Sequence, residues 1–244
     1  GEAIARRAVD EGARVVLHGR NRERGEALRQ ELGEAAVLHV DDLEDAEAPA
    51  RIVQSALSAF QKIDGVVNNA AWIVRSSLES TNPETFDRAM RVNVRAPLFL
   101  IQAAISHLKA TGGSIVNIGS INAYQGEPRQ LDYSISKAGL MTLSKNLANV
   151  LAPERVRVTH LNVGWVLSPN EYQLKISEGL PPDWPETRDR QDVPTGKMTQ
   201  PEEVAAHVAF WLSDESRPIS GSVVDVEQYP FLGRNSLKEG DANA

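Results

Sequence analysis

Hydrophobic positions along the chain follow two alternating patterns. Short apolar runs predict strands buried on both faces, and longer amphipathic stretches between them predict helices. The predicted strands are 13–17, 36–40, 65–68, 114–118, 156–162 and 222–226, and the predicted helices are 1–9, 22–32, 46–60, 83–109, 132–151 and 201–212. Strands that alternate with helices in this way predict an α/β fold built on a parallel, doubly wound sheet.

The alternation continues without an internal repeat, a low-complexity tract or a linker, so residues 1–244 are expected to form a single domain. Residues 168–200 interrupt it with a run that contains five prolines, which is typical of a lid over a substrate site. The small and polar residues 238–244 predict a flexible tail. The first helix has no strand before it, and we therefore expect the sequence to be a fragment or to lack its first residues.

Composition narrows the class of protein. A net charge of −7 argues against partners such as nucleic acid or an anionic membrane, which require a basic surface. No apolar run reaches the length of a membrane span. The chain has no cysteine, which excludes disulfides and thiolate metal sites and suits the cytoplasm. The five histidines are scattered, so no metal site is predicted.

Tyr133 and Lys137 lie four residues apart in a predicted helix, which places both side chains on one face. An ammonium group beside a phenol favours the ionised phenol, so the pKa of Tyr133 is predicted to fall from its usual value of ~10. A tyrosine with a lowered pKa can act as a general acid or base. The alternative is an ordinary exposed helix with a tyrosine near its start.

Small or polar residues follow the predicted strands, and ligands of open α/β sheets bind beyond the carboxyl ends of strands. Arg20 follows the first strand in place of an acid, which favours a cofactor with a 2′-phosphate, although a solvated loop charge is the alternative. Asp42 could accept an adenine amino proton or cap the next helix. Residues 68–71, Ser120 and Gly164 come after later strands and complete the pattern of a nucleotide crevice.

Asn93 lies inside the long helix predicted at 83–109. Asparagine is unfavourable in mid-helix unless its amide finds a partner or distorts the turn. Asn93 is therefore a candidate site residue, with a solvated helix face as the alternative.

Taken together, these residues resemble the short-chain dehydrogenase/reductase superfamily, and the resemblance extends from residue 1 to about residue 221. Tyr133 and Lys137 match the family's Tyr-x-x-x-Lys pair, and Ser120, thirteen residues earlier, matches its catalytic serine. Further matches are Asn93 with the helix asparagine, Asn68 and Ala70 with the Asn-Asn-Ala-Gly turn, in which Ala71 stands in place of the glycine, and Gly164 and Ser168 with residues that flank the nicotinamide.

The resemblance implies a Rossmann-like fold and an NADP(H)-preferring oxidoreductase, with NAD(H) possible, that acts on a small-molecule alcohol or carbonyl. Tyr133 would exchange the proton, Ser120 would bind the reacting oxygen, Lys137 would hold the nicotinamide ribose, and Asn93 would anchor a water relay. The cofactor would also contact Gly1, Arg20, Asp42, Asn68, Ala70, Gly164 and Ser168. A homotetramer or homodimer is implied as well.

Two departures from the family pattern leave an alternative open. The glycine-rich turn and its preceding strand are absent from the 244 residues, and Gly1 aligns with the last glycine of that turn. Residues 227–234 replace the usual Asp-Gly-Gly and are expected to line a substrate pocket or an oligomer interface differently. The alternative is a non-catalytic nucleotide-binding or scaffold protein on the same fold. A serine hydrolase is disfavoured because Ser120 lacks the glycines of a nucleophile elbow.

Overall fold

A computed structural model describes residues 1–190 and 192–230. The strands are β1 (Val15–Gly19), β2 (Ala36–Val40), β3 (Gly65–Asn68), β4 (Ser114–Ile118), β5 (Arg157–Val163) and β6 (Val223–Val226). The helices are α1 (Glu2–Asp10), α2 (Arg22–Leu32), α3 (Ala48–Phe60), α4 (Pro83–Met90), α5 (Ala96–Thr111), α6 (Asn122–Gln125), α7 (Leu131–Leu151), α8 (Pro169–Ser177) and α9 (Pro201–Leu212). A π-helical segment, η2 (Arg91–Arg95), joins α4 to α5.

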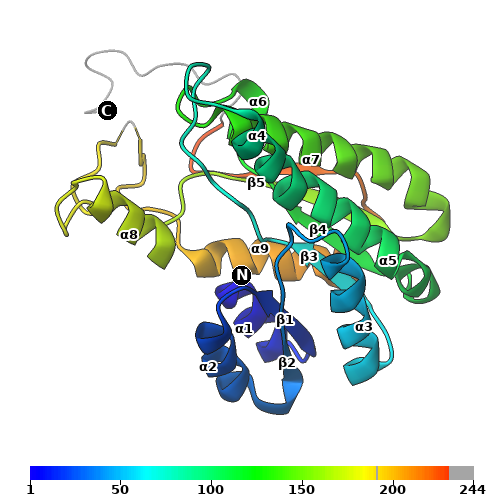
Figure 1. The fold of residues 1–244 in the computed structure, drawn as a ribbon. Coiled ribbons are helices and arrows are strands. Elements are labelled where there is room, and N and C mark those ends of the chain that lie inside the picture. The colour runs from blue at the N-terminus through cyan, green and yellow to red at the C-terminus, as the bar shows by residue number, and fades with distance from the viewer. Residues whose placement is uncertain (191, 231–244) are drawn as a thin grey trace.

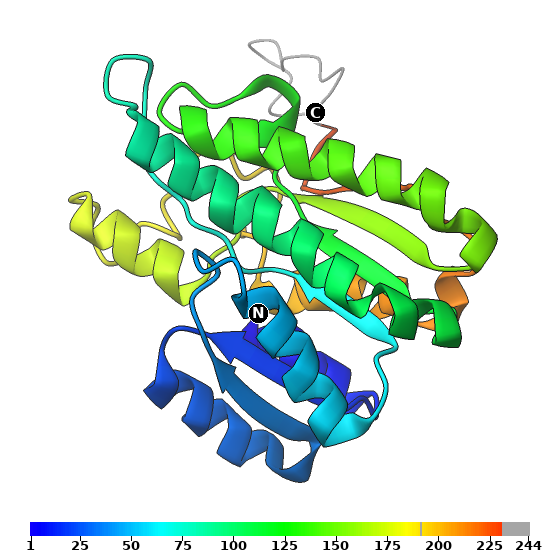
Figure 2. The same ribbon diagram turned by 45° about the vertical axis from the view of Figure 1, so that its right-hand side comes forward.

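All strand pairs are parallel, and helices lie on both faces of the sheet (Figures 1 and 2). The strands β3, β4, β5 and β6 are hydrogen-bonded in that order, whereas β1 and β2 form a separate pair. Helices α4, α5 and α7 cover one face of the larger sheet, and α9 with α1 covers the other (Figures 1 and 2). The predicted α/β fold with a parallel sheet is confirmed, although β1 and β3 do not pair with each other.

Two apolar clusters hold the helices on the larger sheet. On one face, residues such as Ile115, Val158 and Leu108 join the sheet to α5 and are fully buried. On the other face, Val116 and Leu161 pack against α9. The strands β4 and β5 therefore have no exposed face, as their continuous apolar runs predicted. Among the described residues, no helix has both the length and the apolar content to cross a bilayer.

The structure differs from the predicted elements in the connections. The segment 168–200, predicted as a lid, contains helix α8, whose first turn is capped by the Ser168 side chain at the Glu171 N–H, 3.1 Å away. Helix α6 was not predicted because it is a single short turn. The predicted tail at 238–244 lies outside the described residues. So do residues 231–234 of the segment 227–234, which replaces the family's Asp-Gly-Gly.

Candidate active site

Asn93 lies in the π-helical segment and is 1% exposed. Its side-chain oxygen accepts from the Trp72 N–H at 2.7 Å, and its amide donates to the Trp72 carbonyl and the Ser136 hydroxyl, both at 2.9 Å. Both conditions for a mid-helix asparagine are met, since the amide has partners and the helix widens there. The alternative of a solvated Asn93 is wrong. Asn93 instead joins the loop after β3 to helix α7.

Helix α7 places Tyr133 and Lys137 at the carboxyl end of the sheet, and both are buried. The first turn of this helix is fixed by Ser76, whose carbonyl and hydroxyl oxygens accept from the backbone N–H groups of Leu131 and Asp132 at 3.1 Å. The Lys137 ammonium donates to the carbonyl of Ile118 at 2.7 Å and lies 5.6 Å from the centre of the Tyr133 ring. The exposed-helix alternative is therefore wrong.

Ser120 follows β4 in a turn that the neighbouring strand holds. The Gly119 N–H donates to the Leu161 carbonyl at 2.7 Å, and the Ile121 N–H donates to the Val163 carbonyl at 3.3 Å. Ser120 is 7% exposed, and its hydroxyl lies close enough to the Tyr133 phenol to oppose the rise in the pKa of that phenol. The structure thus brings Ser120, Tyr133 and Lys137 together from β4 and α7.

The pKa of Tyr133 is raised to about 12, chiefly by burial, although the hydrogen bond from Ser120 opposes this shift and the Glu171 carboxylate adds to it. Burial also lowers the pKa of Lys137 to about 8. The predicted fall in the pKa of Tyr133 is wrong for this structure. Burial is the largest cause of the rise, and the Lys137 ammonium donates to a backbone carbonyl and not to the phenol.

A second group of candidates gathers where β1, β2 and β3 end. These strands, the loops after them and η2 line a pocket with His18, Gly19, Arg20, Asp42, Leu43, Ala70, Ala71, Trp72 and Val92. The Arg20 guanidinium lies 3.8 Å from an Asp42 carboxylate oxygen, and both side chains are largely exposed. The pocket therefore unites three of the predicted cofactor residues, Arg20, Asp42 and Ala70.

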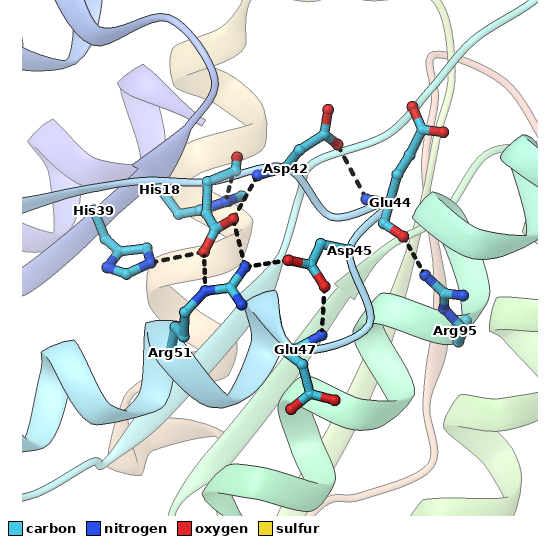
Figure 3. Close-up of polar contacts among 9 residues, drawn as sticks. His18, His39, Asp42, Glu44, Asp45, Glu47, Arg51 and Arg95 are labelled. Carbon is cyan, nitrogen blue, oxygen red and sulfur yellow. Dashed lines mark hydrogen bonds and ion pairs between the residues drawn. The ribbon is translucent and has the colours of Figure 1, made fainter.

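A network of charged side chains fixes the loop after β2 (Figure 3). Arg51 donates two hydrogen bonds to Asp41, at 2.7 and 2.8 Å, and a third to Asp45 at 2.6 Å. This arginine holds the pKa of the Asp41 carboxyl well below its usual range. The loop carries Asp42, for which the sequence allowed an alternative role as the N-cap of the next helix. Since α3 begins at Ala48 with Glu47 as its N-cap, that alternative is wrong.

The remaining predicted cofactor residues lie at the same end of the sheet, but their contacts are within the protein. The Asn68 amide donates to Asn117 at 2.7 Å, so its side chain points along the sheet. Gly164 lies against Glu227, whose carboxylate occupies the space that a Cβ would need. Gly1 lies beside Asn69, and Ser168 caps α8. Within residues 1–190 and 192–230, no cluster of side chains could hold a metal ion.

Comparison with known proteins identifies the family. A family model described as enoyl-(acyl carrier protein) reductase matches residues 1–228. Dehydrogenase/reductase SDR family member 4 of Mus musculus is 33% identical over 239 residues, which cover 93% of this chain and 81% of its own length. The chain belongs to the short-chain dehydrogenase/reductase family.

Two further proteins are similar over nearly the whole chain. An NADP-dependent (R)-specific alcohol dehydrogenase of Lentilactobacillus kefiri is 30% identical over 233 residues, covering 92% of this chain and 90% of its own length. A crystal structure of 3-ketoacyl-(acyl-carrier-protein) reductase from Brucella melitensis, complexed with NADH, matches with a TM-score of 0.82 and 30% identity. That match covers 93% of this chain and 91% of the other. Membership of the short-chain dehydrogenase/reductase family supports an oxidoreductase that binds a nicotinamide cofactor.

Sequence reasoning missed several polar residues around this short-chain dehydrogenase/reductase site. Ser136 joins Asn93 to α7, and Thr81 donates to the buried Asp132 at 2.5 Å. His160 and Asn162 lie fully buried in β5. A signal for the last two was available, because polar residues in a strand enclosed on both faces need buried partners.

Proposed function

We propose that this chain is an oxidoreductase that transfers a hydride between NADP(H) and an alcohol or carbonyl substrate. The observation that carries the proposal is the buried grouping of Ser120, Tyr133 and Lys137 at the carboxyl end of β4. A phenol that is hydrogen-bonded to a serine and backed by a lysine can give a proton to a carbonyl oxygen and take it back from an alcohol. When bound, the reduced nicotinamide would supply the hydride.

At neutral pH, the site holds the proton that reduction of a carbonyl consumes. With a pKa of about 12, the Tyr133 phenol is protonated and can serve as the acid for a carbonyl oxygen. The Ser120 hydroxyl would donate a hydrogen bond to the same oxygen as negative charge develops on it. Lys137, with a pKa of about 8, is mostly protonated at pH 7 and stabilises the phenolate that proton transfer leaves.

The residues at the ends of β1, β2 and β3 fit the adenosine half of a nicotinamide cofactor. The pocket there contains a small-residue stretch, Ala70 and Ala71, which allows a flat ring to approach, and one cation at its rim, Arg20. The Arg20–Asp42 contact is exposed and long, so it leaves the guanidinium able to bind a 2′-phosphate. We therefore propose NADP(H) as the preferred cofactor, with NAD(H) as the weaker one.

The lid supports a substrate without a negative charge near the reacting carbon. Glu171 in the first turn of α8 accepts a hydrogen bond from the Trp165 indole at 2.8 Å, and its carboxylate acts on Tyr133. A carboxylate there repels an anionic substrate and can accept from a substrate hydroxyl. Among the substrates compatible with the sequence, we therefore propose a polyol or sugar. Glu171→Gln should improve kcat/KM for acetoacetate relative to neutral 2-butanone, and an unchanged ratio would contradict this assignment.

Exposed apolar side chains on helices α5 and α7 support self-association. Leu98 and Phe99 on α5 and Ile135 on α7 are each more than a third exposed. We propose a homodimer or homotetramer that covers them, in keeping with the implied family assembly. Light scattering on the purified protein gives the molecular mass in solution, and a mass near 26.7 kDa would exclude both assemblies.

The proposed function is tested first by binding and then by turnover. NADPH and NADH are titrated against the purified protein by fluorescence, and a panel of polyols, secondary alcohols and ketones is then assayed with the preferred cofactor. Tight NADPH binding with turnover of at least one substrate is expected. Binding without turnover across the panel would favour the non-catalytic nucleotide-binding alternative, and failure to bind either cofactor would reject both.

A further inference from the structure

A continuous chain of buried side-chain hydrogen bonds crosses the sheet beneath the catalytic turn, residues 118–120. Asn68 donates to Asn117 at 2.7 Å, and Asn117 donates to the Ser144 hydroxyl at 2.9 Å. Ser144 Oγ lies 3.0 Å from His160 Nδ1, and His160 Nε2 lies 3.0 Å from the side-chain oxygen of Asn162. The chain therefore joins β3, β4, α7 and β5, and all five side chains are buried.

His160 and Asn162 are the members of this hydrogen-bond chain that lie against the catalytic turn, and His160 lies closer. A Cβ built on Gly119 would lie 2.0 Å from His160 Nε2 and 2.5 Å from the Asn162 side-chain oxygen. Gly119 does not have the positive φ that favours glycine, so its backbone conformation would allow other residues. Space is the reason for a glycine here, because the imidazole fills the volume that any other side chain would need.

The catalytic turn is thereby held from two sides. From the helix side, Lys137 donates to the Ile118 carbonyl at 2.7 Å. From the sheet side, the His160 imidazole lies against Gly119, and it is fixed at both ring nitrogens by Ser144 and Asn162. Ser120 is the next residue, so a shift of Gly119 would move its hydroxyl relative to the Tyr133 phenol.

The imidazole suits this place as a neutral ring. A neutral histidine has one N–H donor and one acceptor nitrogen. The Asn162 oxygen can accept from the Nε2–H, and Nδ1 faces the Ser144 hydroxyl, whose single proton is shared between Nδ1 and the Leu140 carbonyl, 2.7 Å from Ser144 Oγ. Burial, together with the charge of Lys137, lowers the pKa of His160 to about 4, so the ring is uncharged at neutral pH.

We propose that His160 is a positioning residue for the reaction, matched to Gly119, which fixes Ser120 against Tyr133 by filling the space beneath the catalytic turn. The expected effect on kcat rests on the proposed function. The expected effect on the position of Ser120 rests only on the contacts described above. Substitution of His160 should lower kcat without a matching loss of cofactor binding, because His160 lies under the catalytic turn and not in the cofactor pocket.

A size exchange between positions 119 and 160 tests the proposal. His160→Ala should lower kcat about tenfold or more, because small displacements of a catalytic group are costly, and should leave the Kd for NADPH within about twofold. Gly119→Ala alone should be more damaging, since its methyl group meets the imidazole. The double variant should recover at least about threefold in kcat over Gly119→Ala, because the methyl group enters the vacated space, although the Asn162 oxygen still lies 2.5 Å from the added Cβ and has to shift.

Thr159→Val is the matched control, because Thr159 is buried in the same strand and its hydroxyl has no partner among the described residues. Its kcat should stay within about twofold of the parent. No recovery in the double variant, or an equal loss of kcat and NADPH affinity in His160→Ala, would overturn the positioning role.

A crystal structure of the His160→Ala variant provides a readout that does not depend on turnover. Displacement of the Ser120 hydroxyl by more than about 0.5 Å would support the proposal. An unmoved Ser120 would overturn it. If the parent protein proves non-catalytic, the proposed function fails, and this structure still decides whether His160 positions the turn.

Discussion

The two halves of the candidate site are held in place by different forces. At the ends of β4 and β5, the catalytic turn rests on buried, mostly uncharged hydrogen bonds that involve Asn117, Ser144 and His160. At the ends of β1 and β2, the loop that carries Asp42 rests on ion pairs of Arg51, which is 44% exposed. The buried hydrogen bonds exclude water, whereas the ion pairs of Arg51 are accessible to water.

The difference matches the role that we propose for each half. Proton transfer requires groups fixed within a fraction of an ångström, and buried polar networks provide this when every member has a partner. Recognition of a charged cofactor requires accessible charge, and exposed charges tolerate movement. Substitutions at the buried end should therefore have larger effects than substitutions at the exposed end.

The largest effect is expected at Tyr133. Tyr133→Phe removes the proton donor and should lower kcat by about 10²- to 10⁴-fold while the Kd for NADPH stays within about threefold. Tyr172→Phe is the matched control, because the Tyr172 hydroxyl donates to Pro182 within the lid, and it should keep kcat within about threefold. Steady-state kinetics and fluorescence titration measure both quantities, and a Tyr133→Phe enzyme with near-parent kcat would reject the assignment of the acid.

A smaller effect, on stability, is expected from acid at His160. Its pKa of about 4 in the folded protein lies below the ordinary value of 6.5, so the unfolded chain takes up the proton first. The stability contributed by the neutral ring is complete above pH 6.5 and is lost as pH falls toward 4, an effect of about 3 kcal/mol. Lys137 and Lys145 add to the shift by opposing a second positive charge.

Urea unfolding at pH 7.5 and pH 4.5 measures that loss. His160→Ala should lose less free energy of unfolding between the two pH values than the parent, by about 2–3 kcal/mol. Equal losses in the two proteins would show that His160 does not titrate in this way and that the acid sensitivity comes from carboxylates instead.

The sequence predicted the parts that depend on local pattern. Alternating apolar runs located the strands, and the spacing of Tyr133 and Lys137 placed both on α7. The rise in the pKa of Tyr133 could not be read from spacing, because it depends on how deeply the packed fold buries the phenol. Likewise, the contact of His160 in β5 with Gly119, the residue after β4, joins residues 41 positions apart, which no local pattern reports.

Cofactor preference should respond more modestly, at Arg20. Arg20→Glu removes the cation offered to the 2′-phosphate and adds an anion beside Asp42, so the Kd for NADPH should rise about 10- to 100-fold. The Kd for NADH should change less than about threefold. Lys62→Glu, a similar charge reversal at an exposed residue paired with Asp64, is the control. An unchanged ratio of the two Kd values would remove Arg20 from the cofactor site.

The smallest effect is expected from the exposed network at the end of β2. Arg51→Ala breaks the hydrogen bonds to Asp41 and Asp45, yet exposed ion pairs contribute at most about 1 kcal/mol. The parent should also lose part of that amount in 1 M salt, whereas the variant should not, because salt screens exposed pairs and hardly affects buried ones. Thermal unfolding of both proteins at low and high salt measures this. A loss above about 3 kcal/mol in Arg51→Ala would show that the loop after β2 is as tightly coupled to the core as the catalytic turn, and the contrast between the two halves of the site would fail.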